Sequence, residues 1–283
     1  LFSGMKDLTV AALDGGAAGV SASGDGSVTG ELDNLYAYSE SESYGVAAYT
    51  ASVSLDAAGG ITARTDTGNG GYGSAYGLMA DENGRLSVTA GDLLLAESAY
   101  GAAFGIYAYN SSVVNAELNG GISALTGYGS SYGVSTRYGS RLYLDISGDI
   151  FAGAADGTAR GIYARGSSIV EVASLDNIYA TAKNGNAYGI SARSGGTVNA
   201  AMSGIIEAET EAGQYGDTAR GIYADGGTAA VNGATAITAT SITSGDGGYG
   251  GSAHGIDAEN GGLASVEMSG PQAGILASVE GRG

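Results

Sequence analysis

Two carboxylates that could act as a pair are the first candidates for chemistry in this sequence. Asp145 follows Glu117 by 28 residues, and each is flanked by apolar residues in the same alternating pattern. Glu31 and Glu267 hold the same offset elsewhere in the chain. Paired carboxylates can hydrolyse glycosidic bonds, and carboxylate oxygens can hold Ca²⁺. We expect an acidic strip on a solvated face; a weak calcium site and a catalytic pair are the alternatives.

Nucleophiles and general bases are scarce. The chain has no Cys and one His, His254, and its only lysines are Lys6 and Lys183. The absence of Cys excludes a disulfide framework, a thiol nucleophile and a Cys-ligated metal, and a lone His lacks a second His for metal binding. Lyases of pectate-like substrates use Lys or Arg, which are few and dispersed here. Those considered are Arg64, Arg85, Arg137, Arg141, Arg165 and Arg193.

These observations predict a chain that is not an enzyme. We expect no catalytic residue, no resident cofactor and no metal, calcium being the weak alternative. Nucleic acid is not expected as a partner, because phosphate binding needs clustered Lys and Arg and the net charge is −18. No apolar run approaches the ~18 residues that span a bilayer, so we do not expect the chain itself to cross a membrane.

The nineteen tyrosines are the more notable surplus. Some stand just before a recurring glycine, some alternate with apolar residues, and some lie five or six residues before that glycine. The first two groups, with one Phe, form a candidate stacking ladder: Tyr44, Tyr76, Phe104, Tyr132, Tyr188, Tyr107, Tyr163 and Tyr223. The third group is Tyr72, Tyr100, Tyr128, Tyr215 and Tyr249. We expect rings that stabilise neighbouring rungs, with His254 as one rung; a stripe that stacks on sugars or on another rod is the alternative.

The elements that position these residues follow from an internal repeat. The recurring glycines, here called anchor glycines, are Gly19, Gly45, Gly77, Gly105, Gly133, Gly161, Gly189, Gly221 and Gly255. Four consecutive intervals between them are 28 residues long, and the others run from 26 to 34. Each repeat contains three short segments in which apolar residues recur every second position, such as Ile106 with Ala108. This period is typical of a β-strand with one buried face.

Three strands per repeat predict an all-β, right-handed parallel β-helix with about 28 residues per coil and about nine coils. Each strand pairs with the same strand one repeat later, at the interstrand spacing of about 4.8 Å. Residues of types that tolerate positive φ precede the third strand and predict a sharp turn there. They are Asn34, Gly60, Gly121, Asp149 and Asn177. A chain with few bulky apolar residues and a high net charge would otherwise be expected to be disordered. The core of a solenoid is thin, however, and few bulky apolar residues are enough to fill it.

The whole chain, residues 1–283, is expected to form one solenoid. Residues 1–18 resemble part of a preceding coil, nine coils begin at residue 19, and the last coil, 255–283, is truncated. Since no amphipathic capping helix is evident, we expect either a fragment of a longer chain or rods that stack end to end through open coils.

The repeat style resembles that of bacterial autotransporter passenger domains over residues 19–279. One repeat reads Ala187-Tyr188-Gly189-Ile190-Ser191-Ala192, then Gly196-Thr197-Val198-Asn199, then Gly204-Ile205-Ile206-Glu207-Ala208. The resemblance implies a β-helix on the outer surface of a Gram-negative cell, anchored in the outer membrane by a region that is not in this chain.

We therefore expect an extracellular, non-enzymatic rod for adhesion or self-association, with a host surface, a neighbouring cell, a glycan or another copy as its partner. One alternative is a subunit of an end-to-end stacked extracellular filament. The other is a polysaccharide-binding or polysaccharide-degrading β-helix. Fold-level analogy cannot choose among them.

Overall fold

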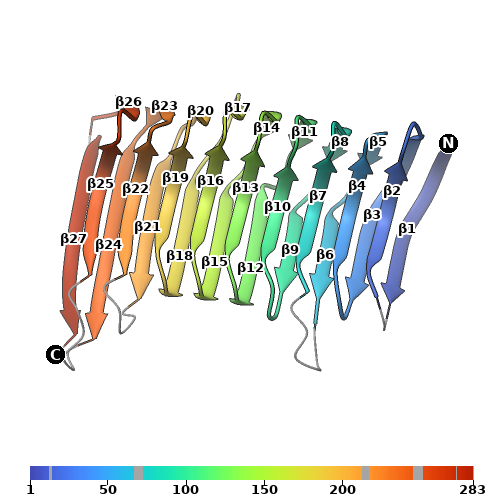
Figure 1. The fold of residues 1–283 in the computed structure, drawn as a ribbon, viewed down its shortest axis with the longest axis horizontal. Coiled ribbons are helices and arrows are strands. Elements are labelled where there is room, and N and C mark those ends of the chain that lie inside the picture. The colour runs from blue at the N-terminus through green and yellow to red at the C-terminus, as the bar shows by residue number, and fades with distance from the viewer. Residues whose placement is uncertain (13–14, 67–72, 212–216, 245–250, 272, 283) are drawn as a thin grey trace.

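The computed structural model describes residues 1–12, 15–66, 73–211, 217–244, 251–271 and 273–282. Within these ranges the regular elements are the strands β1 to β27, which lie side by side along a rod (Figure 1). They form three lateral faces, here called the first, second and third sheets. The second and third are joined because β3 (Ser27–Ser39) runs through both.

The first sheet has nine strands. They are β2 (Ala17–Ser23), β4 (Ser43–Tyr49), β7 (Ala75–Asp81), β10 (Ala103–Ala108), β13 (Ser131–Arg137), β16 (Ala159–Arg165), β19 (Ala187–Arg193), β22 (Thr218–Asp225) and β25 (Ser252–Glu259). The second sheet contains the first half of β3, β5 (Ser52–Ala57), β8 (Arg85–Ala90), β11 (Val113–Leu118), β14 (Arg141–Ile146), β17 (Ile169–Val172), β20 (Thr197–Ala201), β23 (Thr228–Ala234) and β26 (Leu263–Met268). The third contains β1 (Phe2–Ala12), the second half of β3, β6 (Ile61–Thr65), β9 (Leu94–Ser98), β12 (Ile122–Tyr128), β15 (Ile150–Asp156), β18 (Ile178–Asn184), β21 (Ile205–Glu211), β24 (Ala236–Ser244) and β27 (Gly274–Arg282).

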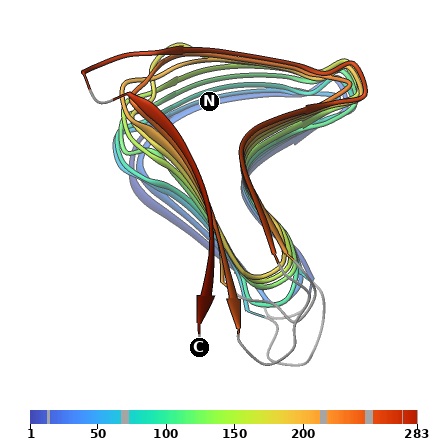
Figure 2. The same cartoon turned by 90° about the vertical axis from the view of Figure 1, so that its left-hand side faces the viewer.

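Pairing is parallel and in register from one repeat to the next. Ile106 of β10 pairs with Val134 of β13, and Ala108 pairs with Thr136. Seen from the C-terminal end, the chain turns counterclockwise as it advances toward the viewer, which is a right-handed path (Figure 2). The predicted right-handed parallel β-helix with three strands per coil is confirmed. The eight intervals between the nine anchor glycines are eight full turns, where about nine coils were expected.

The core is wedge-shaped. The first and third sheets converge away from the second sheet (Figure 2). At the narrow end the two sheets meet through alanines, including Ala152, Ala180 and Ala187. The wide end holds Ile, Leu and Val side chains from all three sheets. The Ile–Ala pairs of the third sheet, such as Ile150 and Ala152, thus place the large residue where the wedge is wide and the small one where it is narrow.

The anchor glycines are required by close packing. A Cβ atom on Gly161 would lie 2.3 Å from Cγ2 of Ile178 and 2.6 Å from the carbonyl oxygen of Gly189, the next anchor glycine. Such distances are far below van der Waals contact, and densely packed interiors do not absorb them. The stacked glycines therefore let β16 and its neighbours approach the third sheet.

The expected turn before the third strand is wrong in its details. Of the five residues expected at positive φ, only Gly121 has it, at 81°. Asn34 lies inside the unbroken strand β3. The turns that precede β15, β18 and β21 are linked by side chains instead: the side-chain amide of Asn177 donates to Asp149 at 2.7 Å, and its oxygen accepts from the backbone N–H of Ile205 at 2.9 Å.

Left-handed residues instead fill the turn between the first and second sheets. They include Asn83, Asn110, Ser167 and Asn260, with φ from 51° to 68°. Short polar side chains tolerate this conformation better than others because they can hydrogen-bond locally. The sharp corner of the coil is therefore the one that follows each strand of the first sheet.

Candidate functional site

The predicted ladder residues come together on the outward surface of the first sheet. Tyr44, Tyr76, Phe104 and Tyr132 lie in one row across β4, β7, β10 and β13, with ring centroids 5.0, 5.0 and 4.9 Å apart in turn. The angles between successive ring planes are 7°, 3° and 4°. The rings are stacked at nearly the interstrand spacing.

The row continues with alternating cations and an aromatic ring. Arg160 follows Tyr132, and its guanidinium carbon lies 5.3 Å from that ring and 5.0 Å from the ring of Tyr188. Arg220 comes next, 5.6 Å from the same Tyr188 ring. His254 occupies the last position in register with Arg220. Cation–π attraction thus replaces ring stacking in this half of the row.

A second row fills the space beside the first. The ring of Tyr107 lies 4.8 Å from that of Phe104, Tyr163 lies 5.8 Å from Tyr132, and Tyr223 lies 5.6 Å from Tyr188. Phe104 is only 7% exposed and Tyr132 only 8%. The two rows therefore use most of their ring faces on one another, which favours the structural role over sugar stacking.

Burial also perturbs the phenols of these rows. It raises the pKa of Tyr76 and of Tyr107 above the ordinary value near 10, because the charged phenolate loses hydration. The phenols of Tyr76 and Tyr107 are therefore neutral at physiological pH.

The other tyrosine group is only partly described. Tyr100 and Tyr128 stack with centroids 5.3 Å apart and planes 6° apart. They are much more exposed than the ladder rings. Tyr72, Tyr215 and Tyr249 lie outside the described residues.

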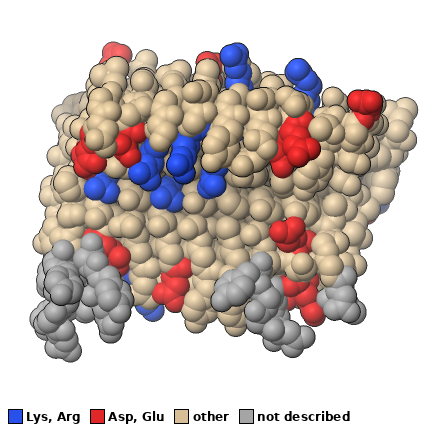
Figure 3. Space-filling model, viewed as in Figure 1, with Lys and Arg blue, Asp and Glu red and all other residues tan. Residues whose placement is uncertain are grey.

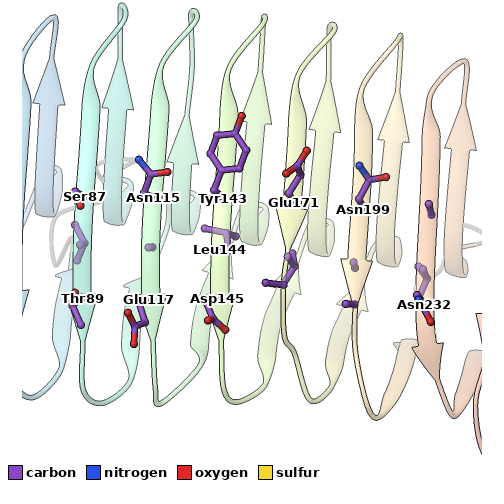
Figure 4. A pocket seen from close by; sticks show the side chains of 18 of the residues that line it. Ser87, Thr89, Asn115, Glu117, Tyr143, Leu144, Asp145, Glu171, Asn199 and Asn232 are labelled. Carbon is purple, nitrogen blue, oxygen red and sulfur yellow. The ribbon is translucent and has the colours of Figure 1, made fainter.

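The acidic strip lies in a groove on the second sheet. Glu117 of β11 pairs in register with Asp145 of β14 on the second sheet. The groove has a volume of about 810 Å³ and follows seven coils from β8 to β26. Figure 4 shows its side chains rising from successive strands. The polar and aromatic ones are Ser87, Thr89, Asn115, Glu117, Tyr143, Asp145, Glu171, Asn199, Asn232, Ser265 and Glu267.

Tyr143 stands in the middle of this groove, between Asn115 and Glu171 in the adjacent strands (Figure 4). It is 38% exposed, and no ring contact to another aromatic is found for it among the described residues. Sequence reasoning missed this tyrosine. Its place between the inward-facing Leu142 and Leu144 was the signal that it points outward.

The acids of the groove do not form a metal-binding cluster. Asp145 accepts a hydrogen bond from the hydroxyl of Ser174. Glu31, at the same offset, pairs with Asp56 beyond the groove, and Glu267 lies at its far end. Within the described ranges no three His, Cys, Asp or Glu side chains gather closely enough to hold a metal ion. Calcium binding, the weak alternative to a site without metal, stays untested, and the arrangement offers hydrogen-bond acceptors.

The arginines are less dispersed than expected. Arg137, Arg165 and Arg193 lie in register on β13, β16 and β19 of the first sheet. Arg64 pairs with Glu97 at 3.6 Å on the third sheet, and Arg85 and Arg141 lie on the second sheet. The 28-residue spacing of the three aligned arginines was the signal that sequence reasoning overlooked.

Comparison with protein-family models, with curated proteins and with solved structures finds no match to this chain. In the part of the chain that the structure describes, no helix is long and apolar enough to cross a membrane. The resemblance to autotransporter passenger domains therefore stays a prediction from the repeats.

Proposed function

We propose that the chain is an adhesive rod without enzymatic activity, which works outside the cell and holds an extended neutral glycan along the groove of the second sheet. The single observation that carries the proposal is this groove, which crosses seven coils with the same outward positions repeated in each. Placement outside the cell rests on the resemblance of the repeats to autotransporter passengers.

The periodicity of the groove suits a polymer. Solenoids present extended binding surfaces because each repeat offers equivalent positions. From β8 to β26 there are six interstrand steps, or about 29 Å at ~4.8 Å per step. A linear glycan lying along the axis would meet a new set of polar side chains at every step.

The lining chemistry favours sugar hydroxyls. Asn115 and Asn199 offer both amide donors and carbonyl acceptors, while Glu117 and Asp145 offer acceptors. The partly exposed ring of Tyr143 offers an apolar surface for a sugar ring. The volume of about 810 Å³ lies within the range of ligand sites.

The charge of the groove favours a neutral ligand. Three carboxylates, those of Glu117, Asp145 and Glu171, lie near its centre, and no Lys or Arg is among the described residues that line it. An anionic polymer would meet like charge here without a compensating cation. Neutral hydroxyls can donate hydrogen bonds to the same carboxylates, and hydrogen bonds to charged acceptors are the stronger kind.

Binding to an array of neutral glycans tests this proposal, followed by calorimetry with the best oligosaccharide. Tyr143→Ala should weaken binding about two- to twelvefold, because an aromatic contact contributes about 0.5–1.5 kcal/mol and about 1.4 kcal/mol is tenfold in affinity. Tyr36→Ala is the matched control, because it removes an exposed tyrosine from the third sheet. Unchanged affinity in Tyr143→Ala, or an equal loss in the control, contradicts the proposal.

Hydrolysis of the bound glycan is a second candidate. It is favoured by the in-register placement of Glu117 and Asp145, since neighbouring strands are ~4.8 Å apart and retaining glycosidases hold their carboxyl groups about 5–5.5 Å apart. Adhesion predicts no new reducing ends when the chain is incubated with its glycan. Reducing ends that disappear in both Glu117→Gln and Asp145→Asn, but persist in Glu31→Gln, would instead establish hydrolysis.

A further inference from the structure

Five of the 11 basic side chains of this acidic protein gather on the first sheet. They lie on four adjacent strands, β13 to β22, and form the main blue region of Figure 3. They are Arg137, Arg160, Arg165, Arg193 and Arg220. We call them the arginine cluster.

Within the described residues, two of the five cluster arginines are paired with acids and three are not. Arg193 donates two hydrogen bonds to Asp225, at 3.1 and 2.9 Å, and Arg220 donates to Asp257 at 2.6 Å. The hydrogen bonds from Asn260 and Arg193 lower the pKa of Asp225, so it is charged at neutral pH. Arg137, Arg160 and Arg165 have no salt bridge to an acid among the described residues. Positive charge is therefore left uncompensated toward the N-terminal side of the cluster.

Aromatic rings hold two of these guanidinium groups in place. That of Arg137 lies 5.4 Å from the ring of Tyr132 and 5.3 Å from the ring of Tyr163. That of Arg160 lies 5.3 and 5.0 Å from the same two rings, and it donates to the Tyr132 hydroxyl at 3.0 Å. The Nε atoms of Arg137 and Arg160 are both buried without a hydrogen-bond partner. The two cations are therefore fixed before any ligand binds, which lowers the entropy cost of binding.

A hollow of about 490 Å³ opens next to Arg137. Arg137 lines it together with Phe104, Tyr132 and the stacked pair Tyr100 and Tyr128. The two tyrosines of this pair are 39% and 53% exposed. The hollow thus combines one guanidinium group with aromatic surface that is still open to a ligand.

We propose that Arg137, Arg160 and Arg165 bind the carboxylates of an acidic glycan, with one sugar ring seated in the hollow beside Arg137. Guanidinium groups recognise carboxylates through two parallel hydrogen bonds. Like charges opposite one another destabilise a sheet, so an anion that bridges Arg137 and Arg165 relieves a repulsion as it binds. This site is on a different face from the second-sheet groove and takes a ligand of opposite character.

The acidic glycan is favoured over nucleic acid by charge density and by shape. Duplex DNA carries one negative charge per about 1.7 Å. Only three guanidinium groups without a salt bridge to a described residue lie here, on two adjacent strands, and the protein has a net charge of −18. Most phosphates of a bound duplex would therefore face no cation. A glycan with a carboxylate on alternate sugars places fewer charges against the acids elsewhere on the surface. Its neutral rings suit the hollow lined by tyrosines.

Calorimetry with a hyaluronan oligosaccharide tests this proposal. The wild-type chain should bind it, binding should weaken as NaCl is raised, and the same oligosaccharide with its carboxyl groups reduced to alcohols should bind at least tenfold more weakly. Arg165→Gln should reduce affinity at least fivefold. Because the Arg165 side chain is exposed, the variant is expected to fold; Arg137→Gln probes the hollow itself and should lose more.

The controls separate this site from general charge and from the groove. Arg141→Gln removes the same charge from an exposed position on the second sheet, and Tyr143→Ala alters the groove; both should bind the acidic oligosaccharide like the wild type. Equal losses in Arg141→Gln and Arg165→Gln, or no loss in either first-sheet variant, overturn the proposal. Tighter binding of a heparin fragment would identify sulfate rather than carboxylate as the group bound and overturn the carboxylate assignment, and tighter binding of a single-stranded oligonucleotide would overturn the glycan assignment.

Discussion

The anchor glycines make the packing of the solenoid directly testable. In Gly161→Ala the new Cβ would lie 2.3 Å from Cγ2 of Ile178, whereas ordinary contact begins at 3.4 Å, a deficit of about 1.1 Å. The carbonyl oxygen of Gly189 at 2.6 Å blocks relief along the axis. Overpacking of this kind costs about 1–3 kcal/mol or more. The reduced entropy of the unfolded chain opposes it by only about 0.4–1 kcal/mol, so the substitution should destabilise the protein by about 2 kcal/mol.

Urea denaturation followed by circular dichroism measures this loss. Gly16→Ala is the matched control, because its nearest atom, the carbonyl oxygen of Glu42, would lie 3.4 Å from the new Cβ; its stability should stay within about 1 kcal/mol of wild type. If Gly161→Ala unfolds at the same urea concentration as the control, or at a higher one, the steric account of the anchor glycines is wrong.

Three further predictions concern the ladder and the turns. Phe104→Ala removes two ring stacks and should lower the free energy of unfolding, measured by guanidinium denaturation, by about 3–4 kcal/mol. Phe104→Tyr keeps the ring and should lower it by less than about 1 kcal/mol. Similar losses in the two variants would contradict a stabilising role for the stacked rings. Because burial raises the folded-state pKa of Tyr107 above 10, the contribution of Tyr107 to stability should be constant below about pH 10 and should fall at higher pH; ionisation of all tyrosines near pH 10 in the folded chain, read from phenolate absorbance, would refute this. Asn177→Ala leaves the backbone N–H of Ile205 without its side-chain acceptor. It should lower the free energy of unfolding by about 1–2 kcal/mol and speed the hydrogen exchange of the Ile205 amide. The control Asn184→Ala removes a hydrogen bond to Asp156 and should leave the exchange of the Ile205 amide unchanged.

The coil could be predicted because its signal is repeated. Apolar residues recur every second position within a strand, and the same pattern returns 28 residues later, as Val134 does after Ile106. All of these residues can be buried together only if the strands stack in parallel. The turns could not be assigned in the same way. Asn34 and Asn177 share a position in the repeat, and each side chain accepts from a backbone N–H of the next coil and donates to an Asp of the preceding one. Asn34 nevertheless lies within the unbroken strand β3, whereas Asn177 lies in a turn. The residue type at this position therefore predicts the side-chain bridge and not the backbone conformation.

The candidate surfaces were predictable only in part. The ladder row from Tyr44 to Tyr132 follows from register alone, and so does the Glu117–Asp145 pair. Whether the rings face solvent or one another is decided by the second row, including Tyr107, which packs against them. The hollow beside Arg137 depends on side chains from several strands. Its shape is a property of packing in three dimensions, and repeat spacing carries no signal for it.

The dependence of affinity on glycan length tests whether the groove of the second sheet holds an extended glycan. Oligomers of increasing length, built on the neutral glycan found on the array, would be titrated into the chain by calorimetry, with hydrogen exchange to locate the bound ligand. A ligand that lies along the groove predicts affinity rising with each added sugar until the oligomer spans about 29 Å, then a plateau. Protection by the longest oligomers should map to the second-sheet strands from β8 to β26. Affinity that is independent of glycan length, or protection confined to the first or third sheet, would show that the glycan does not lie along the groove of the second sheet.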